Sequence, residues 1–183
     1  MNDSMKSNAG IAALGPIMQL AFVPPDFEAA VKHWTRTMGV GPFFLMENVH
    51  LENMRYRGEP TQAHFDLALA YWGELQIELI RPCDTHPSIY TGEYADGLDG
   101  GLHHVCVLVD DIAEGYAACE RNGAQVLIEG SLGESKVIYA DPGRGPGSLI
   151  EILQPAPESP GLFEMIRQAC EGWDGGDPLR TMA

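Results

Sequence analysis

An internal repeat is the feature of this sequence that most constrains its fold. The segment Gly101–Ile112 (GLHHVCVLVDDI) has the pattern of a buried strand that leads into a helix, with His103 and His104 where apolar residues are expected. A weaker copy, Ile17–Phe27 (IMQLAFVPPDF), lies 85 residues earlier, so that position 17 matches position 102. Gln19 then matches His104, and in both copies an aspartate precedes the expected helix, where it can cap the first free N–H groups. The repeat predicts two modules of the same fold.

The order of elements agrees with two modules, because each half reads as strand, helix, strand, strand, strand. The expected first-half strands are 17–23, 43–49, 64–72 and 75–80 with a helix at 26–38, and the second-half strands are 102–109, 124–129, 135–140 and 147–153 with a helix at 111–122. We therefore expect an α+β fold built from two tandem βαβββ modules, followed by a C-terminal helix near 160–172. The predicted boundaries are a flexible leader at 1–15, modules at 16–82 and 101–155, a linker at 83–100, and a C-terminal helix and tail at 156–183.

Composition limits the function and the compartment. The formal net charge of −15 argues against nucleic-acid binding, which needs basic surface to neutralise phosphates. No apolar run approaches the roughly 20 residues of a membrane span, and the N-terminus lacks the pattern of a signal peptide. The four cysteines have no paired metal spacing, which favours reduced thiols. We expect a cytoplasmic protein that binds neither nucleic acid nor membranes.

Two carboxylates stand in the middle of apolar strands. Glu78 and Glu151 each occupy the centre of the strand that closes its module. A carboxylate buried without a partner costs several kcal/mol, unless it is protonated or paired. Together with Gln19 and His104 at matching positions, the two glutamates predict a divalent metal site at the centre of the fold. Strand alternation turns the two histidines to opposite faces, which assigns His104 to the site and His103 to packing or to a contact behind the ligands, although a shift of one residue would exchange them.

These segments resemble the vicinal oxygen chelate (VOC) superfamily, the glyoxalase/bleomycin-resistance/dioxygenase proteins, and within it the methylmalonyl-CoA epimerase-like glyoxalase branch. The resemblance covers about residues 16–155 and is carried by Gly39–Phe44, Gln76–Pro82, His103–His104 and Leu149–Glu151. It implies a glyoxalase fold, a cup of curved mixed sheet that holds a divalent metal ion. It also implies a small-molecule substrate that binds the ion through vicinal oxygens, and a homodimer, for which the C-terminal helix with Trp173 is a plausible contact.

The resemblance implies that Gln19, Glu78, His104 and Glu151 bind the metal, which would be Zn²⁺, Co²⁺, Ni²⁺, Mn²⁺ or Fe²⁺. This set departs from the epimerase pattern, which has His at the first position and Gln at the second. It matches the set that zinc-type glyoxalase I enzymes use. Extradiol dioxygenases need two His and one carboxylate for iron, and Gln19 argues against that reaction.

The reaction implied by the resemblance is removal of a proton next to a carbonyl, as in an isomerase or epimerase. The expected catalytic residues are Glu151 as a base, Asp66 as a second base on the third strand, and Tyr139 as a hydrogen-bond donor or proton shuttle. Three other functions stay open. One is a glyoxalase I-type lyase, which the ligand set favours. Another is a metal-free ligand-sequestering protein of the bleomycin-resistance type, which the acidity favours. The third is another reaction of the superfamily, such as ring opening or C–O cleavage of an aromatic catabolite.

Overall fold

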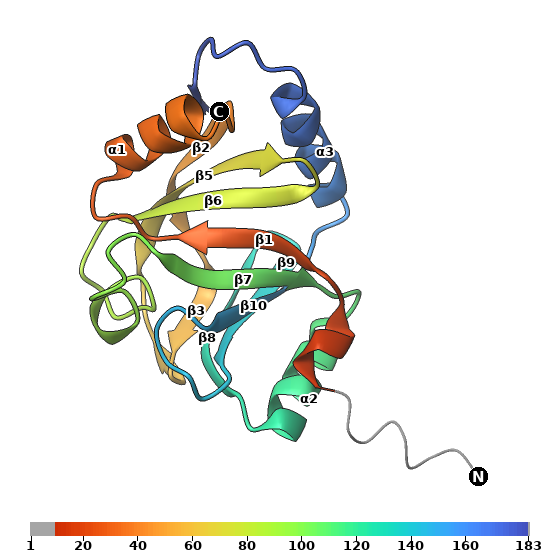
Figure 1. The fold of residues 1–183 in the computed structure, drawn as a ribbon. Helices are drawn as coiled ribbons and strands as arrows, with labels where there is room; N and C mark the ends of the chain where they lie inside the picture. The colour runs from red at the N-terminus through yellow and green to blue at the C-terminus, as the bar shows by residue number, and fades with distance from the viewer. Residues whose placement is uncertain (1–9, 183) are drawn as a thin grey trace.

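One strongly curved sheet organises the molecule. The computed structural model describes residues 10–182, and within them eleven strands follow the order β11-β2-β5-β6-β1-β7-β10-β9-β8-β3-β4. Figure 1 shows this sheet with α1 and α2 outside it at opposite ends. The strands are β1 (Ile17–Phe22), β2 (Phe43–His50), β3 (Glu52–Tyr56), β4 (Glu59–Pro60), β5 (His64–Trp72), β6 (Leu75–Pro82), β7 (Leu102–Leu108), β8 (Gln125–Leu132), β9 (Ser135–Asp141), β10 (Leu149–Gln154) and β11 (Leu179–Thr181).

The two predicted modules are confirmed. In the first, β1 pairs in parallel with β6, which continues to β5 and β2; in the second, β7 pairs in parallel with β10, which continues to β9 and β8. The modules join edge to edge through the antiparallel pair β1 and β7. The fold is therefore α+β with a large, unclosed mixed sheet, as the sequence predicts.

Each module has one helix on the outside of the sheet, and both begin as expected. The Asp26 side chain accepts a hydrogen bond from Ala29 N–H, and the Asp111 side chain accepts one from Ala113 N–H. Gly123 ends the second helix with a φ of 66°, in the left-handed region that glycine tolerates. None of the helices in residues 10–182 is long and apolar enough to cross a membrane. The helices are α1 (Phe27–Lys32), continued by a π-turn (His33–Thr37), α2 (Ile112–Asn122) and α3 (Ser159–Cys170), with 3₁₀ turns at Ile11–Leu14 and Gly92–Tyr94.

The segment between β2 and β5 links the two modules. It contains the short hairpin β3–β4. Strand β3 leaves the first module and pairs with β8, the outer strand of the second. The contact is close: a Cβ added at Gly130 on β8 would lie 2.9 Å from the Leu51 Cβ. The hairpin covers the outer edge of the second module and brings Leu51 against the core inside the cup.

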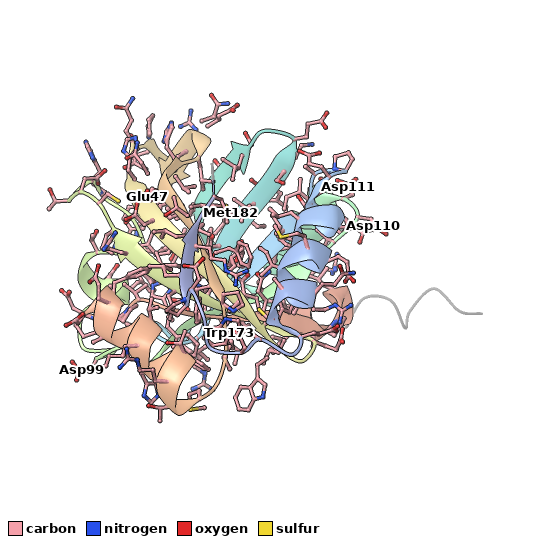
Figure 2. The ribbon with its side chains drawn as sticks, turned by 90° about the horizontal axis from the view of Figure 1, so that it is seen from above. Glu47, Asp99, Asp110, Asp111, Trp173 and Met182 are labelled. Carbon is pink, nitrogen blue, oxygen red and sulfur yellow. The ribbon has the colours of Figure 1, made fainter. Side chains whose placement is uncertain are left out.

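The C-terminal segment covers the first module in a similar way. Helix α3 packs on the concave side of β2 and β5, where Ile166 is fully buried among Phe44, Leu69 and Tyr71. Figure 2 shows Trp173 and Met182 in the segment that follows α3. This segment contains strand β11, which pairs with β2. Since α3 packs within its own chain, these contacts give no support to the expected role of this helix at a dimer interface.

Residues 11–14 and the linker both contribute side chains to the interior. The turn at Ile11–Leu14 packs its Ile11 and Leu14 side chains against the core beneath α2; the remainder of the expected flexible leader, residues 1–9, lies outside the described residues. In the linker, Ile89, Tyr90 and Tyr94 are buried in the core inside the cup. The linker therefore contributes to the interior as well as connecting the modules.

Candidate metal centre

Three of the four predicted ligands form one buried cluster. Glu78 on β6, His104 on β7 and Glu151 on β10 each offer a ligand atom, and these atoms lie within 4.8 Å of one another. The His104 Nε2 atom lies 3.2 Å from Glu151 Oε2 and 3.5 Å from Glu78 Oε2. All three side chains are buried, and the three strands come from both modules. The join between modules therefore holds the cluster.

Gln19 occupies the position in the first module that His104 occupies in the second. The strand pairing shows this equivalence. In the first module, the residue paired with Glu78 is Ala21, two positions after Gln19. In the second module, the residue paired with Glu151 is Cys106, two positions after His104. Gln19 is buried and lines the same cavity as both glutamates. The structure thus brings all four predicted ligands together with the symmetry of the repeat.

A bulge places His103 and His104 side by side. Strand β7 shifts register against β1 between the pairs Ala21–His104 and Phe22–Leu102, which leaves His103 as an extra residue. A bulge interrupts strand alternation and re-aims a side chain. As a result the two imidazoles lie at 80° to each other with their Nδ1 atoms 2.9 Å apart. The expectation that they point to opposite faces is wrong for this reason.

The contacts of His103 fix the hydrogen positions on both rings. His103 Nε2 lies 2.8 Å from the Ile89 carbonyl oxygen, which can only accept, so Nε2 carries the proton. Burial and the neighbouring His104 lower the pKa of His103 to about 3, so its ring is neutral and its Nδ1 accepts. His104 must then donate from Nδ1 to His103. The Nε2 atom of His104 is left to face the two carboxylates, the arrangement by which a second hydrogen bond orients a metal-binding histidine.

The charges of the cluster fit a cation. Among residues 10–182, no group hydrogen-bonds to the buried Glu78 Oε2 atom, and burial raises the pKa of this carboxyl group. Burial lowers the pKa of His104, but the adjacent carboxylates of Glu151 and Glu78 outweigh it and raise that pKa to about 9. The space between the three groups therefore attracts a positive charge, which a proton on Nε2 supplies in the metal-free protein. Two carboxylates, an imidazole and an amide oxygen suit a divalent transition metal, so these residues fit the ion that the resemblance implies.

Tyr139 stands directly over the cluster. Its ring packs edge-on against His104 with centroids 5.1 Å apart, and Tyr139 is the register partner of Glu151. Its hydroxyl lies 3.1 Å from the hydroxyl of Tyr90. Burial and the nearby Glu151 raise the pKa of Tyr139 well above 10, so the phenol stays protonated and can donate. Tyr139 lines the cavity.

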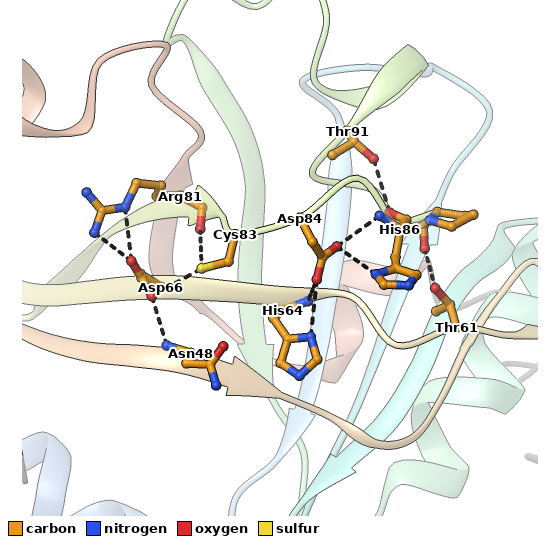
Figure 3. A network of polar contacts seen from close by, with 10 residues as sticks. Asn48, Thr61, His64, Asp66, Arg81, Cys83, Asp84, His86 and Thr91 are labelled. Carbon is orange, nitrogen blue, oxygen red and sulfur yellow. Dashed lines mark hydrogen bonds and ion pairs between the residues drawn. The ribbon is translucent and has the colours of Figure 1, made fainter.

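Asp66 does not lie with the other predicted site residues, so its position gives no support to the predicted role as a second base. On β5 the residues Phe65, Leu67 and Leu69 line the cavity, so Asp66 points to the other face of the sheet. Its carboxylate accepts hydrogen bonds from Arg81 and from Asn48 N–H (Figure 3). Burial raises the pKa of Asp66, but these hydrogen bonds outweigh it and hold the pKa below its usual range.

The strand register shows which residue of the first module takes the place of Tyr139. Leu69 is the partner of Glu78, as Tyr139 is the partner of Glu151, so the first-module counterpart of Tyr139 is Leu69. On β5, the face that carries Asp66 is turned away from the cavity. A helix covers that face: Ala68 and Ala70 pack in the core that α1 shares.

Sequence reasoning missed Gln76 and the contribution of α3. Gln76 is buried, lines the cavity and is the register partner of Gln19; its side chain donates to the Tyr71 hydroxyl. A polar residue two positions before Glu78 in an apolar strand was a usable signal, because both face the same side. Leu162 and Phe163 of α3 also line the cavity. No local signal in the sequence shows which surface α3 covers.

These features define a class: a two-module α+β protein with a buried His–carboxylate centre in a curved sheet. A family model described as the Glyoxalase/Bleomycin resistance protein/Dioxygenase superfamily matches residues 18–140. The chain belongs to this superfamily, which is the VOC superfamily that the sequence suggested. No curated protein matches the chain.

Solved structures support the fold. A hypothetical protein from Bacillus halodurans is 17% identical, with 77% of this chain and 94% of that chain covered and a TM-score of 0.54. Methylmalonyl-CoA epimerase from Mycobacterium tuberculosis is 18% identical, with 84% of this chain and 97% of that chain covered and a TM-score of 0.53. A variant of the Streptomyces coelicolor methylmalonyl-CoA epimerase in complex with 2-nitronate-propionyl-CoA is 22% identical. The match covers 79% of this chain and 96% of that chain, with a TM-score of 0.52. At these identities the likeness concerns the fold alone.

Proposed function

We propose that this protein is a divalent-metal-dependent enzyme that removes a proton next to a substrate carbonyl. The observation that carries the proposal is the buried Glu78 Oε2 atom, which has no hydrogen-bond partner and lies 3.5 Å from His104 Nε2. Glu151 approaches the same nitrogen from the second module. A cluster of this kind is costly to bury unless a cation is held there, and superfamily membership supplies the expectation of a metal.

Gln19, Glu78, His104 and Glu151 would hold the ion. Such an ion supplies Lewis acidity, which lowers the pKa of a C–H next to a bound carbonyl. Glu151 is the base that takes the proton. Tyr139, whose phenol stays protonated, donates a hydrogen bond to the oxygen on which negative charge develops. The apolar cavity walls exclude water from the intermediate.

The position of Asp66 outside the cavity limits which residue can act as the second base. In an epimerase with two bases, the second base must lie on the opposite side of the reacting carbon. Asp66 is on the far face of the sheet, so Glu78 is the remaining carboxylate that can act opposite Glu151. An enzyme that uses two glutamates of its metal site in this way fits an isomerase. It fits equally the glyoxalase I-type lyase, whose ligand set this chain matches.

A metal-free binding protein of the bleomycin-resistance type is the second candidate. Two buried carboxylates in a cavity and a net charge of −15 would also attract a cationic organic ligand. The two functions differ in their need for the ion. Metal content therefore separates them.

The first experiment is elemental analysis of the purified protein after dialysis against Zn²⁺, Co²⁺, Ni²⁺ or Mn²⁺. We expect about one divalent ion per chain in the parent and much less in Glu151→Gln. Glu47→Gln changes an exposed glutamate and serves as the matched control. Solvent-deuterium exchange into 2-oxo compounds and thioesters then tests proton removal, and Glu151→Gln should abolish it.

A parent protein that binds none of the four ions would contradict the metal-dependent proposal and favour the binding protein. Stoichiometric metal without exchange into any carbonyl compound would contradict proton removal alone. The expected homodimer stays a prediction, which light scattering of the purified chain would test.

A further inference from the structure

The metal centre forms the polar end of a small apolar cavity. Its volume is about 150 Å³. The polar groups Gln19, Gln76, Glu78, Glu151 and Tyr139 lie together, and most of the other lining residues are apolar. The apolar wall is contributed by both modules and by α3. The cavity therefore has one polar end and an apolar body.

We infer that the site takes a substrate with an oxygen-bearing head and a compact, uncharged apolar body, about the size of one six-membered ring. This inference rests on the proposed function, because the head is the part that reaches the metal centre. An apolar cavity of roughly 150 Å³ is large enough to hold benzene. Larger ligand sites usually run from about 300 to 1,000 Å³. The volume of the cavity thus matches a body of about one such ring.

Charge argues against a coenzyme A thioester. Among the described residues, neither lysine nor arginine lines the cavity. The nucleotide part of coenzyme A carries several phosphate charges, which are bound in proteins by cations or by helix N-termini. Arg81 is on the other face of the sheet, where it is paired with Asp66 and Glu28. The net charge of −15 adds a general repulsion of polyanions.

Helix α3 sets the size of the body. Leu162 and Phe163 face the cavity, whereas Met165 on the same helix is 41% exposed. The buried Ile166 anchors the helix on the first module, so these walls are held in place. A change at Phe163 should therefore alter which body fits, and a change at Met165 should not.

Hydroxamates test this inference, because they share a metal-binding head and differ in the body. With Zn²⁺-loaded protein and calorimetry, we expect benzohydroxamate to bind at least about tenfold more tightly than acetohydroxamate, a difference of roughly 1.4 kcal/mol. Succinic monohydroxamate, with an anionic body, should bind no better than acetohydroxamate, and millimolar coenzyme A should not compete. The bulky 2-naphthohydroxamate should bind poorly to the parent and to Met165→Ala, but more tightly to Phe163→Ala.

Equal binding of acetohydroxamate and benzohydroxamate, tightest binding of the anionic probe, or competition by coenzyme A would overturn the inference while leaving the metal site intact. A metal-free measurement separates the two proposals. Fluorobenzene should bind the chelator-treated parent, as detected by ¹⁹F line broadening, and should not bind Leu162→Trp, which fills the chamber. If Zn²⁺ fails to bind but fluorobenzene does, the proposed function fails and the apolar chamber stands; if fluorobenzene does not bind, the chamber is refuted.

Discussion

The two modules share one backbone plan but contribute different chemistry to the centre they enclose. Each supplies a polar residue from its first strand and a glutamate from its last: Gln19 and Glu78 from one, His104 and Glu151 from the other. The second-module histidine is braced by His103, which is held in turn by a backbone carbonyl. In the first module, an oxygen of Glu78 has no hydrogen-bond partner. The second module therefore holds its candidate ligand His104 in a fixed orientation, whereas the first module contributes a buried carboxylate oxygen that a bound cation would neutralise.

The strand next to each glutamate shows the same contrast. Tyr139 is the partner of Glu151 and has its hydroxyl against Tyr90, whereas Leu69 is the partner of Glu78 and packs against α3. The residues beside the two glutamates therefore differ: the second module places a phenol there and the first an apolar side chain. The repeat gives the cluster its symmetry, and different residues at equivalent positions make its two halves unequal.

The largest expected effect compares the two first-strand ligands. We expect His104→Gln to weaken metal binding by more than about 100-fold and Gln19→Leu by about tenfold, because an oriented imidazole is the stronger ligand. Competition with a metal-binding dye measures both affinities. Equal losses would show that the two modules contribute alike and would remove the asymmetry.

The second prediction tests the brace itself. His103→Phe keeps an aromatic ring but cannot accept from His104 Nδ1, so we expect metal affinity to fall by about 10- to 100-fold. Tyr90→Phe, which removes a hydroxyl that bonds to Tyr139 instead, is the matched control and should keep its affinity. Unchanged affinity in His103→Phe would mean that the ring only packs.

The third prediction separates binding from chemistry in the second module. Tyr139→Phe removes the donor but leaves the ring on His104, so metal affinity should stay within about twofold of the parent value. The rate of solvent-deuterium exchange should fall by about tenfold or more, as expected when one donor to a developing oxyanion is lost. Normal exchange would assign Tyr139 to packing alone.

The sequence alone was enough to predict the two modules and to single out the polar residues that lie where the modules join. The repeat aligned Gln19 with His104, and two acidic residues in apolar strands are costly enough to require a shared explanation. Both aspartate caps also follow from local chemistry that involves only neighbouring residues. Features of this kind are visible in sequence because each depends on spacing along one strand or one helix turn.

Other parts of the site depend on contacts between distant segments. The bulge at His103 appears only where β7 meets β1, so strict alternation assigned this ring to the wrong face. The face of β5 that meets the cavity is decided by α1 and α3, not by the pattern of β5. Likewise, nothing within residues 50–62 indicates that the β3 hairpin crosses to the second module. Alternation identifies two faces of a strand but not the neighbour of each.

The smallest expected effect on the metal site comes from Asp66→Asn, and it tests the exclusion of this residue. Metal affinity and exchange rate should stay at the parent values, because the carboxylate is on the opposite face of the sheet. The free energy of unfolding should fall by about 1–3 kcal/mol at pH 7, since the charged hydrogen bonds from Arg81 and Asn48 weaken. Because the pKa of Asp66 is lowered on folding, its contribution is present above the unfolded value of about 3.9 and is lost as the pH falls through the folded value. Urea unfolding at pH 7 and pH 3, beside the exposed control Asp96→Asn, should therefore show the difference between parent and Asp66→Asn narrowing in acid. A loss of exchange activity in Asp66→Asn at full metal content would instead return Asp66 to the catalytic residues and make the first module a chemical partner of the second.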